Sequence, residues 1–159
     1  MTDDASPPTG GPITGLSHVQ LSVSDVAASA EWYTAALGLE SYAADPDFGY
    51  VALRHRVARV VFVLTARANV EPPAGIVVPA GGSLDHLAFA VPDGDALDEW
   101  AGHLTRIGID HPGVVLENGN PSLQLRDPDG VAIELVAPRA SAPCRPPDPP
   151  PATGQTVAR

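Results

Sequence analysis

The chain has 159 residues, a net charge of −10 and 44% hydrophobic residues, which is enough apolar material for one folded domain. All nine basic residues are arginine, and so acidic a chain is a poor ligand for nucleic-acid phosphates or anionic membranes. The single cysteine, Cys144, excludes an intramolecular disulfide and a cysteine-based zinc site. Because we find neither a secretion signal nor an apolar run long enough to span a bilayer, we expect a cytoplasmic protein.

Both ends of the chain are rich in Pro, Gly, Ser and Thr. Residues 1–12 and 138–159 therefore cannot bury enough apolar surface to fold, and we expect disordered tails around a domain at 13–137. The Pro-rich run at 146–151 is able to form a polyproline II helix that docks a partner. A disordered end is the interpretation that we prefer.

The domain contains an internal repeat with an offset of 68 residues. Five identities recur at this spacing, and they pair Leu16, His18, Asp25, Glu31 and Trp32 with Leu84, His86, Asp93, Glu99 and Trp100. One fixed offset for five residues makes chance a weak explanation. The sequence therefore predicts two copies of one supersecondary unit, at 13–70 and 82–137.

Each copy is predicted to begin with a strand followed by a helix. In the first strand, 18–23, polar and apolar residues alternate, so that His18, Gln20 and Ser22 share one face. A helix with apolar residues at helical spacing follows, with Asp25 as its N-cap and Gly38 as its stop. The second strand begins at His86, and its helix ends at Gly108.

Further strands are expected after each helix, near 49–54 and 59–65 in the first copy and near 113–117, 122–126 and 131–136 in the second. Asp127-Pro-Asp-Gly130 predicts a turn between the last two. The arginines at 54, 56 and 59 are interpreted as a solvated hairpin turn, with a basic pocket as the alternative. The whole pattern predicts an α+β fold in which one sheet face lies under helices and the other curves around a cavity.

His18, His86 and Glu134 are predicted to face that cavity. The two histidines occupy equivalent places in the repeat, and Glu134 lies among apolar residues, where an unpaired carboxylate is costly to bury. Two imidazoles and one carboxylate form the facial triad typical of non-haem iron, and they also serve zinc or manganese. The alternative is that Glu134 pairs with Arg126 or Arg54 and that the histidines make only local hydrogen bonds.

Strand alternation also predicts the rest of the cavity wall. Arg126 would orient an anionic substrate group or pair with Glu134 or Asp127. His111, just after the second helix, is a possible acid or base at the cavity mouth, and Glu134 is the other candidate catalytic residue. The predicted substrate-facing residues are Gln20, Ser22, Tyr50, Ala52, Val63, Gln124 and Arg126.

At these residues the chain resembles the glyoxalase, bleomycin-resistance and extradiol-dioxygenase superfamily. The match comprises the opening His18-x-x-x-x-Val-x-Asp25, its counterpart from His86 to Asp93, and the closing Asp127-Pro-Asp-Gly-x-x-Ile-Glu134-Leu. The resemblance implies paired βαβββ modules around one divalent metal ion held by His18, His86 and Glu134. It further implies a small substrate bound through adjacent oxygens, and for many members a homodimer.

The chain also departs from the branches of this family. Glyoxalases and epimerases carry a further Glu or Gln where this chain has Val63, which argues against both. Ring-cleaving dioxygenases place a histidine and a tyrosine near the positions of Glu117 and Gln124, which weakens a catechol-cleaving assignment. The anion-binding cationic residues of fosfomycin-modifying members have no clear match.

We therefore expect a metal-dependent enzyme of this superfamily that acts on a small molecule. Three protein ligands favour dioxygenase-like chemistry over lyase or isomerase chemistry, with Fe²⁺ preferred and Zn²⁺, Mn²⁺ or Ni²⁺ also compatible. The alternative is a non-catalytic protein that sequesters an antibiotic or metabolite, for which the acidic charge would suit a cationic drug.

Overall fold

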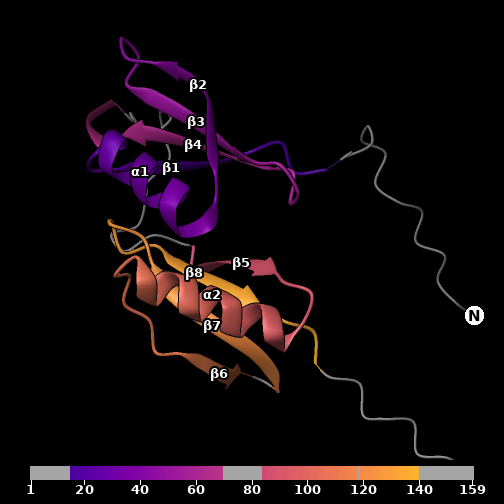
Figure 1. Cartoon of the computed structure of the whole chain (residues 1–159). Helices are drawn as coiled ribbons and strands as arrows, with labels where there is room; N and C mark the ends of the chain where they lie inside the picture. The colour runs from indigo at the N-terminus through magenta and orange to yellow at the C-terminus, as the bar shows by residue number, and fades with distance from the viewer. Residues whose placement is uncertain (1–14, 70–83, 118, 140–159) are drawn as a thin grey trace, which may run out of the picture.

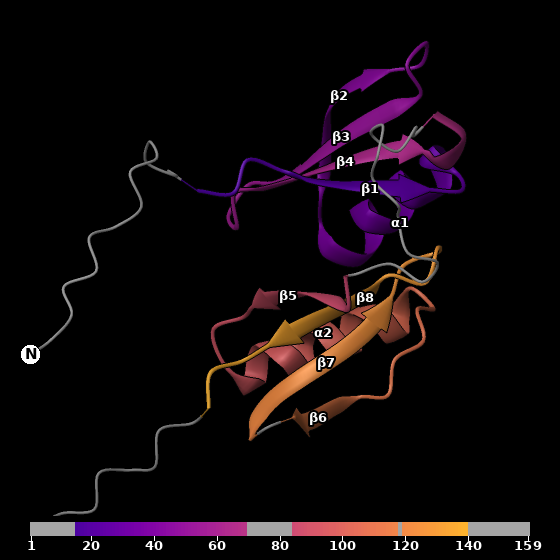
Figure 2. The same cartoon turned by 180° about the vertical axis from the view of Figure 1, so that it is seen from behind.

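The computed structural model describes residues 15–69, 84–117 and 119–139, so the expected tails lie outside it apart from Pro138 and Arg139. Figures 1 and 2 show two modules, one above the other, in each of which a sheet lies beside an α-helix. The two modules are the two copies that the repeat predicts. No helix in the described ranges is both long and apolar enough to cross a membrane.

The first module runs strand, helix and three strands: β1 (Val19–Val23), α1 (Val26–Leu37), β2 (Glu40–Asp45), β3 (Tyr50–His55) and β4 (Val60–Ala66). Its sheet has the order β1-β4-β3-β2. Strand β1 is parallel to β4, and the other neighbours are antiparallel. Strand β1 is therefore an edge strand.

The second module repeats this order with β5 (His86–Ala90), α2 (Gly94–Arg106), β6 (Val114–Glu117), β7 (Asn120–Arg126) and β8 (Ala132–Val136). Its sheet has the order β5-β8-β7-β6, which places β5 at the edge that β1 holds in the first sheet. Figure 2 shows this sheet in front of α2. The prediction of paired βαβββ modules is confirmed.

Strand β2 has no counterpart among the strands that alternation predicted in the first copy. Its sequence, Glu-Ser-Tyr-Ala-Ala-Asp, has few large apolar residues, and most of its residues are exposed. The pairing with β3 also shifts between Ser41 and Ala43, which breaks the two-residue period. An exposed, bulged edge strand leaves too weak a pattern for periodicity to detect.

The helices begin and end where local chemistry predicts. Asp25 accepts a hydrogen bond from the backbone N–H of Ala28 at 3.0 Å, and Asp93 accepts one from Ala96 at 2.9 Å. Gly38 ends α1 in the left-handed conformation, with φ of 68°, that a side chain disfavours. Asp25 and Gly38 are thus confirmed as cap and stop.

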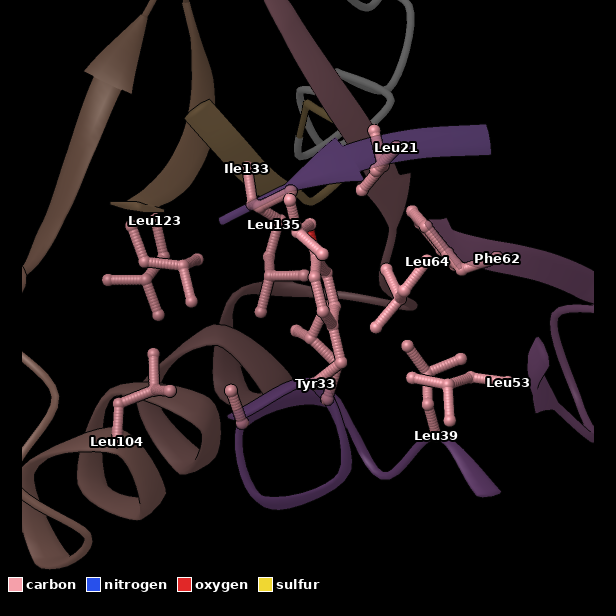
Figure 3. Packing of buried hydrophobic residues seen from close by; sticks show 14 of the residues in the cluster. Leu21, Tyr33, Leu39, Leu53, Phe62, Leu64, Leu104, Leu123, Ile133 and Leu135 are labelled. Atoms are coloured by element: carbon pink, nitrogen blue, oxygen red, sulfur yellow. The ribbon is translucent and has the colours of Figure 1, made fainter. Parts of the chain in front are cut away.

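One hydrophobic core joins the two modules. Figure 3 shows Tyr33 and Phe62 of the first module in the same cluster as Leu104 and Leu135 of the second. The Phe62 ring stacks on Tyr33 with centroids 5.2 Å apart and lies 6.0 Å from Phe89. Because the helix-facing sides of both sheets supply this core, the opposite sheet faces are available for a site.

The turn at Asp127-Pro-Asp-Gly130 fastens the second module to the first. Buried Asp127 accepts a hydrogen bond from the Tyr33 hydroxyl at 2.9 Å, and burial keeps that phenol protonated by raising the pKa of Tyr33. Asp129 accepts hydrogen bonds from the Ser24 backbone N–H at 2.9 Å and from Arg67 at 2.7 Å. The motif is therefore a turn, as predicted, and also a link between modules.

Asp129 should make stability depend on acid pH. Burial alone would raise the pKa of Asp129, but the hydrogen bonds from Ser24 and Arg67 outweigh it and lower the pKa below the ordinary value of 3.8. The charged carboxylate therefore stabilises the fold fully above pH 3.8, and this contribution is lost as pH falls through the lower folded-state pKa.

We expect Asp129→Asn to lower the free energy of unfolding by about 0.5–1.5 kcal/mol near neutral pH, because the Ser24 N–H and the Arg67 guanidinium lose a charged acceptor. Denaturant unfolding of both proteins should show this difference shrinking as the pH falls below about 4. An equal difference at neutral and acid pH would contradict the assigned role of the charge.

Candidate metal centre and cleft

A cleft of about 1100 Å³ lies on the second module. His86, Gln124, Arg126 and Glu134 line it from β5, β7 and β8. These residues alternate with Leu87, Leu123, Leu125, Ile133 and Leu135, which belong to the core or pack against it. The structure thus places four of the predicted site residues, His86, Gln124, Arg126 and Glu134, in the lining of one cleft.

His86 and Glu134 are brought together in this cleft. His86 Nε2 lies 3.5 Å from Glu134 Oε2, and the Glu134 side chain is only 14% exposed. On the other side of the ring, His86 Nδ1 lies 2.8 Å from a carboxylate oxygen of Asp85. A carboxylate on one ring nitrogen fixes the ring and leaves the other nitrogen free to act as a metal ligand.

The electrostatics around His86 are dominated by carboxylates. The hydrogen bond to Asp85 raises the pKa of His86; slight burial opposes this rise, and the charges of Asp85, Glu134 and Glu117 add to it. The surroundings of the imidazole thus favour positive charge next to Nε2. A proton on the ring or a bound cation would supply that charge.

The pair also fits a divalent ion by distance. Ligand atoms that each lie about 2.1 Å from one ion are roughly 3 Å apart at right angles and about 3.4 Å apart in a tetrahedron. The observed 3.5 Å is longer than a direct hydrogen bond and close to the tetrahedral spacing. An imidazole and a carboxylate are moreover donors that Fe²⁺, Zn²⁺ and Mn²⁺ share.

His18 does not join this pair within the chain. It directly precedes edge strand β1, is exposed, and has its Nδ1 3.1 Å from the Ser17 hydroxyl. Within residues 15–69, 84–117 and 119–139, no three His, Cys, Asp or Glu side chains gather closely enough to hold a metal ion. One chain therefore assembles two of the three predicted ligands.

The predicted substrate-facing residues divide between two surfaces. Gln124 and Arg126 line the cleft of the second module with His86 and Glu134. A separate hollow of about 490 Å³ lies on the first sheet. Ser22 is exposed on β1 and does not line this hollow. That hollow is lined by Gln20, Tyr50, Ala52 and Val63 together with Tyr42 and Phe48.

Arg126 and Gln124 have partners that the sequence did not predict. Arg126 donates to the carbonyl oxygen of Gly130 at 2.9 Å, and no ion pair with Glu134 or Asp127 occurs in the described part of the chain. The Gln124 amide donates to Glu117 at 2.6 Å. Of the two alternatives for Arg126, the pairing with Glu134 or Asp127 is therefore not found among the described residues.

His111 lines the cleft, but its ring is fully occupied. The Thr105 hydroxyl donates to the carbonyl of Ala101 at 2.9 Å, so its oxygen accepts from His111 Nε2 at 3.0 Å. His111 Nδ1 then accepts from the Gly113 backbone N–H at 3.1 Å. With both nitrogens bonded, His111 is suited to holding the loop after α2.

The strand registers place Val63 as the first-module counterpart of Glu134. Gln20 pairs with Val63 in the first sheet, and Ala88, its repeat equivalent, pairs with Glu134 in the second. The first module therefore has an aliphatic side chain where the second has its carboxylate. This agrees with the sequence comparison above, in which Val63 stands where glyoxalases and epimerases carry a further Glu or Gln.

Three residues have roles that the sequence did not reveal. Asp85 orients His86, and its position next to a candidate ligand was the available signal. Trp32 is half-buried and lines the cleft. Outside the cleft lining, His103 lies 2.8 Å from the Ala35 carbonyl and so connects α2 to α1.

Comparison with known proteins identifies the family. The family model described as the glyoxalase/bleomycin resistance protein/dioxygenase superfamily matches residues 15–135. The chain belongs to this superfamily. Its match covers both modules and therefore His18, His86 and Glu134.

Relatives within the superfamily differ in what their names describe. The chain is 32% identical over 125 residues to biphenyl-2,3-diol 1,2-dioxygenase 3 of Rhodococcus globerulus, covering 76% of this chain and 61% of that protein. It thus spans about three fifths of the relative's length.

Solved structures of the superfamily share the fold. A glyoxylase/bleomycin resistance protein/dioxygenase domain from Frankia sp. aligns with a TM-score of 0.66 and 25% identity, covering 82% of this chain and 96% of that one. A variant of the fosfomycin resistance protein of Listeria monocytogenes, complexed with Mn(II) and a dihydroxypropylphosphonic acid, aligns with a TM-score of 0.60 and 19% identity, covering 79% and 93%.

Proposed function

We propose that the protein is a metal-dependent enzyme that acts on a small molecule with two adjacent oxygen atoms. The observation that carries this proposal is the His86–Glu134 pair, 3.5 Å apart in the cleft, with Asp85 orienting the imidazole. A divalent ion held there would supply Lewis-acid chemistry to the two oxygens. Glu134 and His86 would bind the ion, and Asp85 would keep the correct histidine nitrogen turned toward it.

The third ligand in this proposal is His18 of a second copy of the chain. Both β1 and β5 are edge strands, and His18 and His86 stand at their equivalent starts. Leu16 and Leu84, just before them, are 71% and 54% exposed. A two-fold dimer that sets module one of one copy beside module two of the other would cover these leucines and bring His18 to the pair.

Dioxygenase-like chemistry with Fe²⁺ is the reaction that we favour. Two histidines and one carboxylate leave open positions on the ion, and Val63 adds no fourth protein ligand from the first module. The dioxygenase from Rhodococcus globerulus, which shares 32% identity, supports this choice. Lyase or isomerase chemistry in the same cleft is the alternative reaction.

Asp85→Asn tests the role of the residue that orients His86. We expect it to weaken metal binding by about 10- to 100-fold, which is typical for loss of a partner behind a ligating histidine. Titration calorimetry with Fe²⁺ under anaerobic conditions, or with Zn²⁺, measures the change. Asp98→Asn removes an exposed carboxylate from α2 and should leave metal affinity unchanged. Equal affinities for all three proteins would refute the proposed role of Asp85.

Sequestration of a ligand without catalysis is the second candidate function. It is favoured by one observation, namely that no cluster of three potential ligands forms within the described residues of a single chain. Metal content separates the two functions. About one tightly held ion per chain, together with ligand binding that chelation abolishes, supports the enzyme. Binding that survives chelation, without turnover, supports sequestration.

A further inference from the structure

The charges in the cleft are strongly unbalanced. Four carboxylates line it, from Asp85, Asp110, Glu117 and Glu134. The only arginine in that lining is Arg126, and its guanidinium is already engaged by the carbonyl of Gly130. The formal charges of the four carboxylates and the arginine sum to −3. A bound divalent ion would change this sum to −1, so the cleft would still be negative.

Glu117 is the carboxylate best placed to meet a substrate beside the proposed ion. Glu117 lines the same cleft as His86 and Glu134. Gln124, which pairs with Glu134 across β7 and β8, donates to Glu117 at 2.6 Å and so ties Glu117 to the neighbouring strand. The ion would neutralise Glu134, whereas Glu117 has no cationic partner among the described contacts of the cleft.

Trp32 adds an aromatic wall to the same cleft. Its half-buried indole is fixed by an edge-to-face contact with Tyr33, whose ring centroid is 5.0 Å away. Indole is the aromatic side chain that attracts organic cations most strongly. Carboxylates and an indole in one concave surface form a combination that binds ammonium groups and repels anions.

We propose that the cleft selects substrates that carry a positively charged ammonium group in addition to the two adjacent oxygens. This inference rests on the proposed function, since the oxygens are those that the ion would hold. Glu117 contributes the charge and Trp32 the aromatic surface. Anionic substrates such as phosphonates are disfavoured in the cleft.

A series of catechols with one frame and different charges tests the inference. Dopamine carries an ammonium group, ethylcatechol is neutral and dihydroxyphenylacetate carries a carboxylate. Binding is measured by titration calorimetry to the full chain loaded with Zn²⁺, which does not oxidise catechols. We expect dopamine to bind roughly tenfold more tightly than dihydroxyphenylacetate, with ethylcatechol between them, and we expect added salt to narrow the gap.

Two variants in the cleft and one control outside it locate the preference. Glu117→Gln still offers Gln124 an acceptor oxygen but removes the charge, so it should weaken dopamine binding several-fold and leave ethylcatechol binding unchanged. Asp98→Asn removes the same charge outside the cleft and should change neither. Trp32→Leu should also weaken dopamine more than ethylcatechol, by about two- to fivefold.

The possible outcomes separate this inference from the proposed function. Suppose that the protein retains one zinc ion per chain. If the three catechols then bind with equal affinity, or if dihydroxyphenylacetate binds most tightly, the charge preference is wrong and the metal site stands. If zinc is not retained, phenethylamine, which lacks both oxygens, tests whether the metal-free protein binds an ammonium group. If it binds the metal-free protein and is weakened by Glu117→Gln, ammonium recognition stands without the enzyme; if it does not bind, both proposals fail.

Discussion

We expect His86→Ala to lower the affinity for the divalent ion by more than 100-fold. The imidazole is one of the two ligands that a single chain brings together, and its removal should cost more than the roughly 10- to 100-fold typical of losing an outer partner. Elemental analysis of protein purified with and without added Fe²⁺ measures the retained metal. Calorimetric titration with Zn²⁺ gives the affinity.

His55→Ala is the matched control for this variant. His55 accepts a hydrogen bond from the Ala58 backbone N–H at 2.9 Å in the β3–β4 turn, away from the cleft of the second module. The His55→Ala protein should have the same metal content as the wild type. The metal site is wrong if His86→Ala keeps as much metal as His55→Ala.

Phe62→Ala is expected to destabilise the fold by about 3–5 kcal/mol, because it empties a fully buried aromatic position. The ring contacts Tyr33 in its own module and Phe89 in the other, so its loss should loosen the joint between modules as well as the first sheet. Urea unfolding followed by far-ultraviolet circular dichroism measures the change in the free energy of unfolding.

Val57→Ala provides the comparison for Phe62→Ala. Val57 is 88% exposed in the β3–β4 turn, and its truncation should change stability by less than about 0.5 kcal/mol. A cost below about 1 kcal/mol for Phe62→Ala would mean that the shared core does not hold the modules together.

The repeat and the strand alternation were sufficient to predict most of the fold. The spacing of five identities predicted two equivalent units, and alternation placed His86 and Glu134 on one sheet face and Ile133 and Leu135 on the other. These features depend on the local backbone period, which the sequence carries directly. The predicted cap at Asp25 is likewise a local hydrogen bond, and Asp93 makes the equivalent bond in the second module.

What the sequence could not predict depends on how the modules meet. Asp129 looks like an ordinary turn residue until the first module places Ser24 and Arg67 against it. His18 has the repeat position of His86, yet it lies at the edge of the other sheet. Residue periodicity describes a sheet face but contains no information on which sheets share a cavity.

The most direct test of the metal site mixes two defective proteins, His18→Ala and Glu134→Ala. Each alone should bind little metal. If the site is built from His18 of one copy and His86 and Glu134 of the other, random exchange of subunits should restore about a quarter of the wild-type metal content, because half the dimers carry one intact site of two. Native mass spectrometry confirms that mixed dimers form. Formation of mixed dimers without any recovery of metal would contradict a site shared between two copies.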